Sequence, residues 1–199
     1  DLDAYERIMS GEAPGFYYAR DIHPNAHRLA ERLAALEGAT WAVMCGSGMA
    51  AISALFLTTL RPGDRVVAGD RLYGRAAQLL RQGIGGFGVR AEFMDLSDLE
   101  SVEKALKSPA RLLHAETISN PMLQVVDLER LAALAHGRGC LFAVDNTFAT
   151  PVLTRPLELG ADFVIESLTK MIGGHSDVTL GAVCGRPPSC PPPASGEGR

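Results

Sequence analysis

The sequence predicts an α/β fold, in which a mostly parallel sheet is covered by helices on both faces. Strand-like apolar runs alternate along the chain with segments that repeat leucine and alanine at helical spacing, and this alternation is typical of βαβ units. The chain has 199 residues, 47% of them hydrophobic, enough for one domain with a sizeable core. Several strand-like runs end in polar motifs, and open α/β sheets bind ligands at the carboxyl ends of their strands.

The order of elements follows from the pattern. After Asn25, a residue type that favours N-caps, leucines recur at helical spacing until Gly38 stops the run. A strand at residues 40–45, a turn at 46–49 and an apolar helix at 50–60 follow. Further strands are expected at 65–69, 89–95, 111–117, 140–147 and 162–168, with helices around 76–80, 99–106 and 128–135. We expect three parts: an N-terminal segment (1–24), a main domain (25–185) and an unstructured Pro/Gly/Ser-rich tail (186–199).

Composition narrows the class of partner. The net charge is −4 and no basic stripe is present, which argues against nucleic-acid binding. No apolar run approaches the roughly 20 residues that a membrane helix needs. The four cysteines (Cys45, Cys140, Cys184, Cys190) show no CxxC spacing, which indicates reduced thiols in the cytosol. Small molecules and other subunits are therefore the expected partners. Because the chain starts at Asp1 without methionine, we expect a piece of a longer protein.

The motif "DFVIESLTKMIGGHSD", residues 162–177, places Lys170 just past the end of an expected strand. Ser167 and Thr169 precede it, and two glycines and a histidine follow. A lone loop lysine is usually solvated, because lysine is among the most exposed residue types. Its role therefore depends on what lies near it.

Three more polar signals fall at strand ends. Gly46-Ser47-Gly48-Met49 opens a helix, whose free backbone N–H groups favour an anion, although a tight structural turn explains it equally well. Asp145 ends the strand "FAVD", where an acid can also serve as a turn cap. Asn120 of "SNP" could be turn chemistry before a proline.

Taken together, the four signals suit pyridoxal 5'-phosphate. This cofactor needs an anion cradle for its phosphate, an acid beside its ring nitrogen and a lysine for the Schiff base. Lys170 would be the amine and Asp145 the acid. The turn at Ser47 would supply the cradle, through the Gly48 and Met49 amides and the hydroxyls of Ser167 and Thr169.

The motifs "SGMAAI", "YG", "ETISNP", "DNTFATP" and "ESLTKMIGGHSD" resemble those of the Cys/Met-metabolism (trans-sulfuration) family of pyridoxal-phosphate-dependent enzymes. This family includes cystathionine γ-synthase, cystathionine γ-lyase, methionine γ-lyase and O-acetylhomoserine sulfhydrylase. The resemblance runs from about Tyr18 to Gly185. It implies an incomplete large domain of the aspartate-aminotransferase-like fold (fold type I), in a cytoplasmic homo-oligomer that is a dimer of dimers at full length.

The resemblance also implies residue roles. Tyr73 would stack on the cofactor ring and take part in proton transfer, and Asn120 would contact the ring hydroxyl. Tyr18 and Arg20 would reach the phosphate of a neighbouring subunit. A core tyrosine and a surface arginine are the plain alternatives. His23 and Arg75 depart from the family pattern. Arg75 would lie near the substrate channel, so the resemblance leaves the identity of the substrate open.

The implied function is that of a C–S lyase or γ-replacement enzyme acting on sulfur amino acids or O-acyl-homoserine through a Schiff base on Lys170. An aminotransferase or desulfurase of the same fold, and a non-catalytic remnant, are the alternatives. Family members are longer, and the resemblance places the arginine that binds the substrate carboxylate in a C-terminal domain. We therefore expect this chain alone to turn over such substrates poorly.

No metal site is expected. His23 and His27 are four residues apart, but Pro24 and a cap at Asn25 leave His23 outside the helix. Other charged side chains are expected to fix a loop or to lie on a solvated helix face: His175, Asp177, Lys104 and Lys107.

Overall fold

The computed structural model describes residues 1–19 and 23–186. In this part of the chain, seven strands form one sheet in the order β1-β7-β6-β5-β4-β2-β3. The strands are β1 (Trp41–Cys45), β2 (Arg65–Gly69), β3 (Arg90–Met94), β4 (Leu112–Glu116), β5 (Leu141–Asp145), β6 (Phe163–Glu166) and β7 (Gly181–Gly185). β7 pairs antiparallel with β1 and β6, whereas the other neighbouring pairs are parallel. The predicted α/β class is confirmed, and β7 is a strand that the pattern did not predict.

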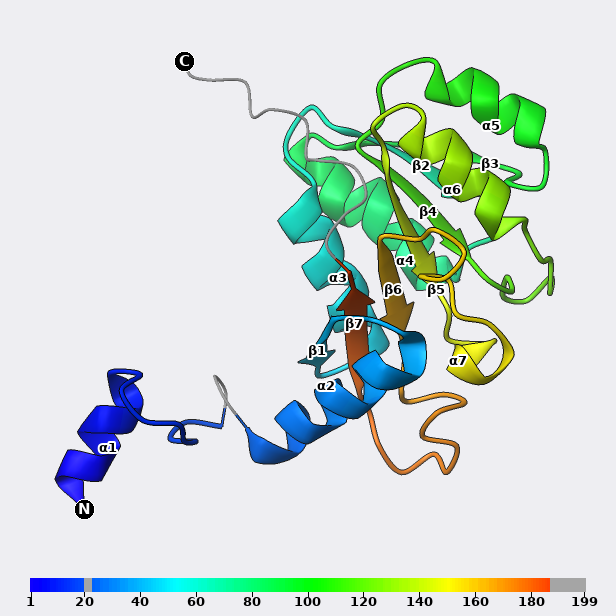
Figure 1. The fold of residues 1–199 in the computed structure, drawn as a ribbon. Coiled ribbons are helices and arrows are strands. Elements are labelled where there is room, and N and C mark those ends of the chain that lie inside the picture. The colour runs from blue at the N-terminus through cyan, green and yellow to red at the C-terminus, as the bar shows by residue number, and fades with distance from the viewer. Residues whose placement is uncertain (20–22, 187–199) are drawn as a thin grey trace, which may run out of the picture.

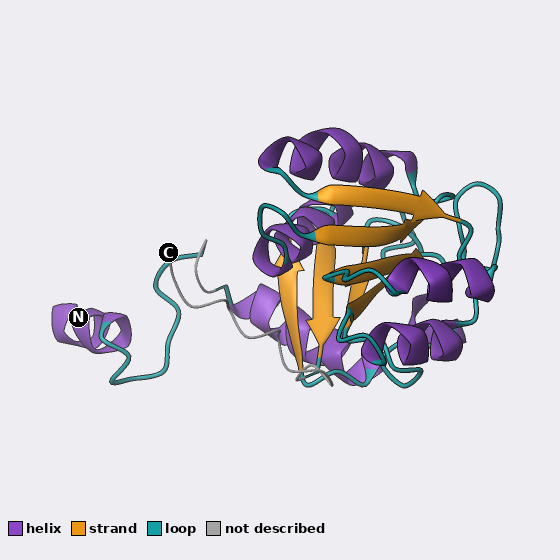
Figure 2. Cartoon of the chain, turned by 90° about the horizontal axis from the view of Figure 1, so that it is seen from above, coloured by secondary structure: helices purple, strands orange, loops and turns teal. Residues whose placement is uncertain are grey.

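Helices cover both faces of the sheet, as Figures 1 and 2 show, while α1 stands apart from it. None of the residues of α1 is buried. The α-helices are α1 (Leu2–Met9), α2 (Pro24–Glu37), α3 (Gly48–Thr59), α4 (Gly74–Gln78), α5 (Leu99–Leu106), α6 (Leu128–His136) and α7 (Thr150–Leu153). A π-helical turn η1 (Leu79–Gly83) and a 3-10 turn η2 (Ile84–Phe87) continue α4.

Alternate residues of the central strands supply two cores, one on each face. Val66 of β2 belongs to the cluster that contains Phe56 of α3. Its neighbour Val67 belongs to the cluster that contains Leu131 of α6. Burying each such side chain contributes about 1.5–3 kcal/mol. The two cores fix the sheet and therefore the positions of the strand ends.

The boundaries of α2 correct one prediction. The helix begins at Pro24, and the N-cap is His23, whose ring Nδ1 accepts the N–H of Asn25 at 3.2 Å. The prediction of Asn25 as the cap is wrong, because proline already occupies the first helical position, where its missing N–H costs nothing. Gly38 ends the helix with φ of 65°, as its position predicts.

Two other elements differ from their predicted spans. α3 begins at Gly48 rather than at residue 50, because the Ser47 hydroxyl caps the first turn by accepting the N–H of Ala50. The helix expected at 76–80 is α4 with its π-helical continuation. Of the expected tail, only Arg186 falls among the described residues, and it donates to the Gly38 carbonyl at 2.6 Å.

Within the described ranges, no helix has the length and apolar character needed to cross a bilayer. The same residues hold no group of three or more His, Cys, Asp or Glu side chains placed to bind a metal ion.

Candidate active site

A pocket of about 260 Å³ lies at the carboxyl ends of the parallel strands. Its walls come from the N-terminus of α3, the ends of β4, β5 and β6, and the loop that follows β6. Nine of the predicted site residues line it together: Ser47, Gly48, Met49, Tyr73, Asn120, Asp145, Ser167, Thr169 and Lys170. Positions separated by more than 100 residues in the sequence thus meet in one pocket, although their individual roles stay predictions.

The two remaining candidates are elsewhere. Tyr18 is half-exposed on the N-terminal segment and is not among the residues that line the pocket. Arg20 lies outside the described residues. The predicted contact of this pair with a neighbouring subunit therefore remains a prediction.

The N-terminus of α3 has the properties of an anion cradle. Ser47 accepts the N–H of Ala50 at 3.0 Å, but among the described residues no acceptor meets the N–H groups of Gly48 or Met49. A Cβ added at Gly48 would lie 2.6 Å from the Cβ of Ser167. Only glycine lets the helix end approach the lysine loop this closely, so the two free amides face the pocket with the positive end of the helix dipole.

The two predicted hydroxyls differ. No acceptor for the Ser167 hydroxyl lies within the described part of the chain, so this hydroxyl is available to a ligand. The Thr169 hydroxyl donates to the Leu180 carbonyl and accepts the Leu180 N–H, both at 3.0 Å. Thr169 therefore holds the loop against β7 and would have to exchange a bond to donate to a phosphate.

Lys170 sits on a fixed backbone with an exposed side chain. Its N–H donates to the Ser167 carbonyl at 3.0 Å, and its own carbonyl accepts the Gly174 N–H at 2.8 Å. No described carboxylate forms an ion pair with its amine. The amine lines the pocket and is not bound to a carboxylate, as an anchoring nucleophile requires.

Asp145 is a buried acid at the end of β5 that lacks a cation. One carboxylate oxygen accepts the Thr147 N–H at 3.0 Å. Burial raises the pKa of Asp145, and the bonds from Thr147 oppose this only in part. No Lys, Arg or His of the described chain forms an ion pair with it. A positively charged ligand nitrogen in the pocket would supply the missing partner and favour the ionised form.

Glu116 is a pocket residue for which sequence reasoning assigned no role. It ends β4 and is the register partner of Asp145 on β5. Its carboxylate accepts the N–H of Tyr73 at 2.6 Å and that of Asn120 at 3.2 Å, so it positions both. Burial raises the pKa of Glu116 to about 7, and Asp145 adds to the shift. An acid after an apolar strand was the available signal, the same one that identified Asp145.

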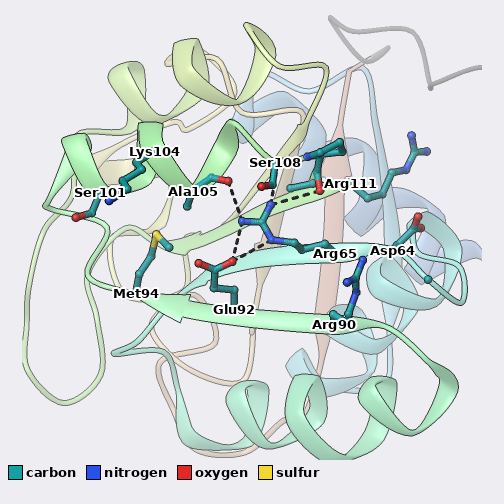
Figure 3. A pocket seen from close by; sticks show the side chains of 13 residues that line it. Asp64, Arg65, Arg90, Glu92, Met94, Ser101, Lys104, Ala105, Ser108 and Arg111 are labelled. Carbon is teal, nitrogen blue, oxygen red and sulfur yellow. Dashed lines mark hydrogen bonds and ion pairs between the residues drawn. The ribbon is translucent and has the colours of Figure 1, made fainter.

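A larger cavity of about 780 Å³ lies at the opposite, amino ends of β2 and β3 (Figure 3). The Arg65 guanidinium occupies its centre and donates to Glu92 at 2.7 Å and to the carbonyls of Ala105 and Ser108 at 2.9 and 2.8 Å. These bonds tie the C-terminal end of α5 to the sheet. The central cation is thus committed to structure.

Comparison with known proteins identifies the family. The family model described as Cys/Met metabolism PLP-dependent enzyme matches residues 2–190. The chain belongs to this family. It is 46% identical to an L-methionine gamma-lyase from Pseudomonas deceptionensis over 179 residues, which is 89% of the chain and 45% of that protein. The chain is 43% identical to an O-succinylhomoserine sulfhydrylase from Pseudomonas aeruginosa, covering 92% of the chain and 45% of that protein.

A solved structure supports the fold assignment. An O-acetylhomoserine (thiol)-lyase from Campylobacter jejuni superposes with a TM-score of 0.85 at 30% identity, covering 94% of this chain and 46% of the other. That structure contains N'-pyridoxyl-lysine-5'-monophosphate. The predicted fold-type I large domain is therefore confirmed. The chain spans about half the length of these relatives.

The pocket fits the cofactor of the family. Pyridoxal phosphate carries an anionic phosphate, a basic ring nitrogen and an aldehyde. The pocket offers the free amides of Gly48 and Met49, the uncompensated acid Asp145 and the amine of Lys170. Each of these groups lacks a partner that the corresponding part of pyridoxal phosphate would provide.

Proposed function

We propose that this chain binds pyridoxal phosphate covalently through Lys170, as part of a C–S lyase or γ-replacement enzyme. Its substrates would be sulfur amino acids or O-acyl-homoserine. The convergence of an amine, a cation-free acid and two unpaired amides on one pocket carries the proposal. The names of the relatives include a methionine γ-lyase and an O-succinylhomoserine sulfhydrylase, which supports the substrate class. These two relatives are a lyase and a sulfhydrylase by name, not an aminotransferase or a desulfurase.

Each residue has a definite task in this proposal. The Lys170 amine would hold the cofactor through its aldehyde and would be placed to remove the proton from the substrate Cα. The Asp145 carboxylate holds the proton on the ring nitrogen. Gly48 and Met49 orient the phosphate through their N–H groups. The cofactor, when bound, takes up the negative charge left by the departing proton.

Tyr73 and Asn120 complete the pocket through Glu116. The Tyr73 N–H and the Asn120 N–H both donate to this one carboxylate. The ring of Tyr73, which is 42% exposed, lies at the pocket wall. We assign Tyr73 to stacking and proton transfer and Asn120 to the ring hydroxyl, with Glu116 as the residue that fixes both.

The described residues offer no arginine clamp for the substrate carboxylate, and this limits the turnover expected of the chain alone. No arginine is among the described residues that line the pocket. Arg75, expected near the substrate, donates instead to Gln78 at 2.9 Å. A bidentate arginine clamp fixes a carboxylate and the orientation of the α-proton. We therefore propose that the chain alone binds the cofactor but turns over little substrate, and that the whole protein acts as a cytoplasmic homo-oligomer.

Borohydride reduction after incubation with pyridoxal phosphate tests the covalent assignment. The chain has three lysines, Lys104, Lys107 and Lys170. Peptide mapping should find one label, on Lys170, and none in Lys170→Ala. The matched control, Lys104→Ala with Lys107→Ala, removes both lysines of the α5 region and should label as fully as the wild type. Labelling at either of these two residues would contradict the proposal.

A further inference from the structure

Two glutamates, one of which directly precedes the pocket residue Ser167, form a buried carboxyl pair. Glu37 is the last residue of α2 and Glu166 the last residue of β6, and both are fully buried. Their side chains lie within hydrogen-bonding reach of each other. The Asn146 amide donates to one Glu37 oxygen at 3.2 Å. The other Glu37 oxygen, both Glu166 oxygens and the Asn146 side-chain oxygen are buried without a partner.

Among the described residues, no buried cation pairs with either glutamate. The cation acting on Glu37 is Arg155, which is nearly half exposed and already bridges Glu158 at 3.1 Å. The titratable neighbours on the strands, Asp145 on β5 and Cys184 on β7, carry no positive charge. Glu37 also lies at the C-terminus of α2, where the helix dipole disfavours a negative charge. Two ionised carboxylates here would repel each other, and Asn146 and the exposed Arg155 would compensate only in part.

A single proton on the pair would allow a hydrogen bond between the two side chains. Two carboxylates can only accept hydrogen bonds, whereas a carboxylic acid beside a carboxylate makes a donor and an acceptor. The Asn146 amide, which donates to Glu37 and to the Thr154 carbonyl at 3.1 Å, offsets the raised pKa of Glu166 only in part. Burial raises the pKa of both glutamates, and Glu37 raises that of Glu166 further, as expected for like charges in one site.

We propose that Glu37 and Glu166 share one proton in the folded protein and are positioning residues for the pocket. Asn146, which binds Glu37, directly follows Asp145, and its N–H donates to the Ile165 carbonyl at 2.9 Å. Glu166 directly precedes Ser167. The pair therefore joins the end of α2 to the strand ends that carry the acid and the cradle hydroxyl. The positioning role rests on the proposed function, whereas the proton count does not.

The proton count is measurable on the cofactor-free chain. Unfolded glutamate ionises near pH 4.5, so folding takes up one proton at higher pH, and stability falls as pH rises toward the raised folded-state pKa values. Between about pH 5 and 7 the unfolding equilibrium constant should rise about tenfold more per pH unit in the wild type than in Glu166→Gln or Glu37→Gln. Urea unfolding at several pH values measures this slope. In each variant the new amide donates to the remaining carboxylate, so the hydrogen bond survives.

The double variant tests sharing. With one proton between the pair, Glu37→Gln combined with Glu166→Gln should have the same slope as either single variant. A further tenfold change per pH unit in the double variant would mean that each glutamate holds its own proton, and the proposal would fail. Single variants with the wild-type slope would mean that both are ionised, which also overturns it.

A spectroscopic measurement does not depend on the variants. In wild-type protein carrying carboxyl-labelled glutamate, infrared absorption of a protonated side chain should persist at about pH 9, above the pKa at which Glu116 ionises. The label separates this signal from Asp145. Its absence would overturn the shared proton.

The positioning role has its own readout. Above about pH 9 the affinity for added pyridoxal phosphate should fall more steeply in the wild type than in Glu166→Gln, because only the wild-type pair loses its shared proton and gains a second negative charge. Glu166→Ala should lose at least tenfold in affinity at neutral pH, while Glu166→Gln stays within about threefold of the wild type. Equal affinities for the Ala and Gln variants would refute positioning. A chain that binds no cofactor would refute the proposed function and leave the proton count standing.

Discussion

The two ends of the sheet carry cavities of opposite character. The cavity at the amino ends is three times the volume of the pocket at the carboxyl ends, about 780 against about 260 Å³. At its centre, Arg65 satisfies every nitrogen with Glu92 or a carbonyl oxygen. In the smaller pocket, the Lys170 amine and the amides of Gly48 and Met49 have no described partner. Unpaired polar groups that converge on one pocket, and not volume, distinguish this candidate binding site from a cavity whose central cation is fully bonded.

The contrast follows from chain geometry. Parallel strands deliver their following loops, and the next helix N-terminus, to one edge of the sheet, so free N–H groups and short polar side chains collect there. At the other edge helices end, and their carbonyl groups require donors. Arg65 meets this need at the end of α5, where it donates to the Ala105 and Ser108 carbonyls.

Among the residues that line the two cavities, the largest effect should come from Glu116 at the carboxyl edge. Burial raises the pKa of Glu116 from 4.5 to about 7, so the folded state binds the proton more tightly than the unfolded state. The stability that Glu116 contributes is therefore fully present below pH 4.5 and is lost as pH rises to about 7, by about 3 kcal/mol. Glu116→Gln should remove this fall, as measured by urea unfolding at several pH values.

The Gln variant has a predictable side effect and a control. Glutamine offers one acceptor in place of two, so the longer bond from Asn120 is lost at every pH, which costs about 1 kcal/mol. Glu92→Gln at the amino edge, where the carboxylate is 47% exposed, is the control variant and should keep the fall that Glu116 causes. If the stability of Glu116→Gln fell with rising pH as steeply as that of the wild type, groups other than Glu116 would cause the fall.

Asp145→Asn should weaken cofactor binding by roughly 1.5–3 kcal/mol, because it replaces a charge-assisted bond to the ring nitrogen with a neutral one. The Thr147 N–H keeps its acceptor, so the fold should persist. Asp162→Asn is the matched control, a buried acid before β6 that accepts the Phe142 N–H at 2.8 Å and pairs with His136. It should alter stability without altering cofactor affinity. Fluorescence titration measures the cofactor affinity of both variants. An equal loss of affinity in Asp162→Asn would contradict a specific role of Asp145 in binding the cofactor.

Gly48→Ala should reduce cofactor affinity by about tenfold, or ~1.4 kcal/mol. The added Cβ would lie 2.6 Å from the Ser167 Cβ, so the helix end must retreat from the lysine loop and take the two free amides with it. Gly46→Ala is the control two residues away, where an added Cβ meets nothing within 4 Å. A loss of equal size in both variants would show that loop entropy, and not the close approach, is responsible.

The fold was predictable where strands are apolar and end in a polar residue. The strands at β4, β5 and β6 follow this pattern and were placed correctly. β7 was missed because five residues bounded by glycines, Gly181–Gly185, give a weak strand signal. Its glycines have a packing reason that no local pattern shows, since Gly185 lies against the Trp41 ring and Gly181 against the Ser47 backbone.

The candidate site was predictable for the same reason. What the sequence did not predict are contacts between residues that lie far apart along the chain. Nine candidate residues each follow a strand or open a helix, so the parallel sheet brings them together. The commitment of the Thr169 hydroxyl to Leu180 depends on the path of the loop. The pairing of Glu37 with Glu166 joins positions 129 residues apart in the numbering. Burial of two acids together is a tertiary property that neither segment reveals.

The smallest effect should come from the larger cavity. Arg65→Met removes the donors that hold the end of α5 and should lower the free energy of unfolding by about 1 kcal/mol. Cofactor affinity should not change, because every bond of this guanidinium goes to Glu92 or to carbonyls at the amino edge.

Arg90→Met is its control, an exposed cation of the same cavity with no described side-chain bond, and should change stability by less than about 0.5 kcal/mol. Thermal unfolding and cofactor titration on the same samples separate the two readouts. If Arg65→Met weakened cofactor binding as much as Gly48→Ala does, the two ends of the sheet would be coupled. The division between a structural edge and a binding edge would then be wrong.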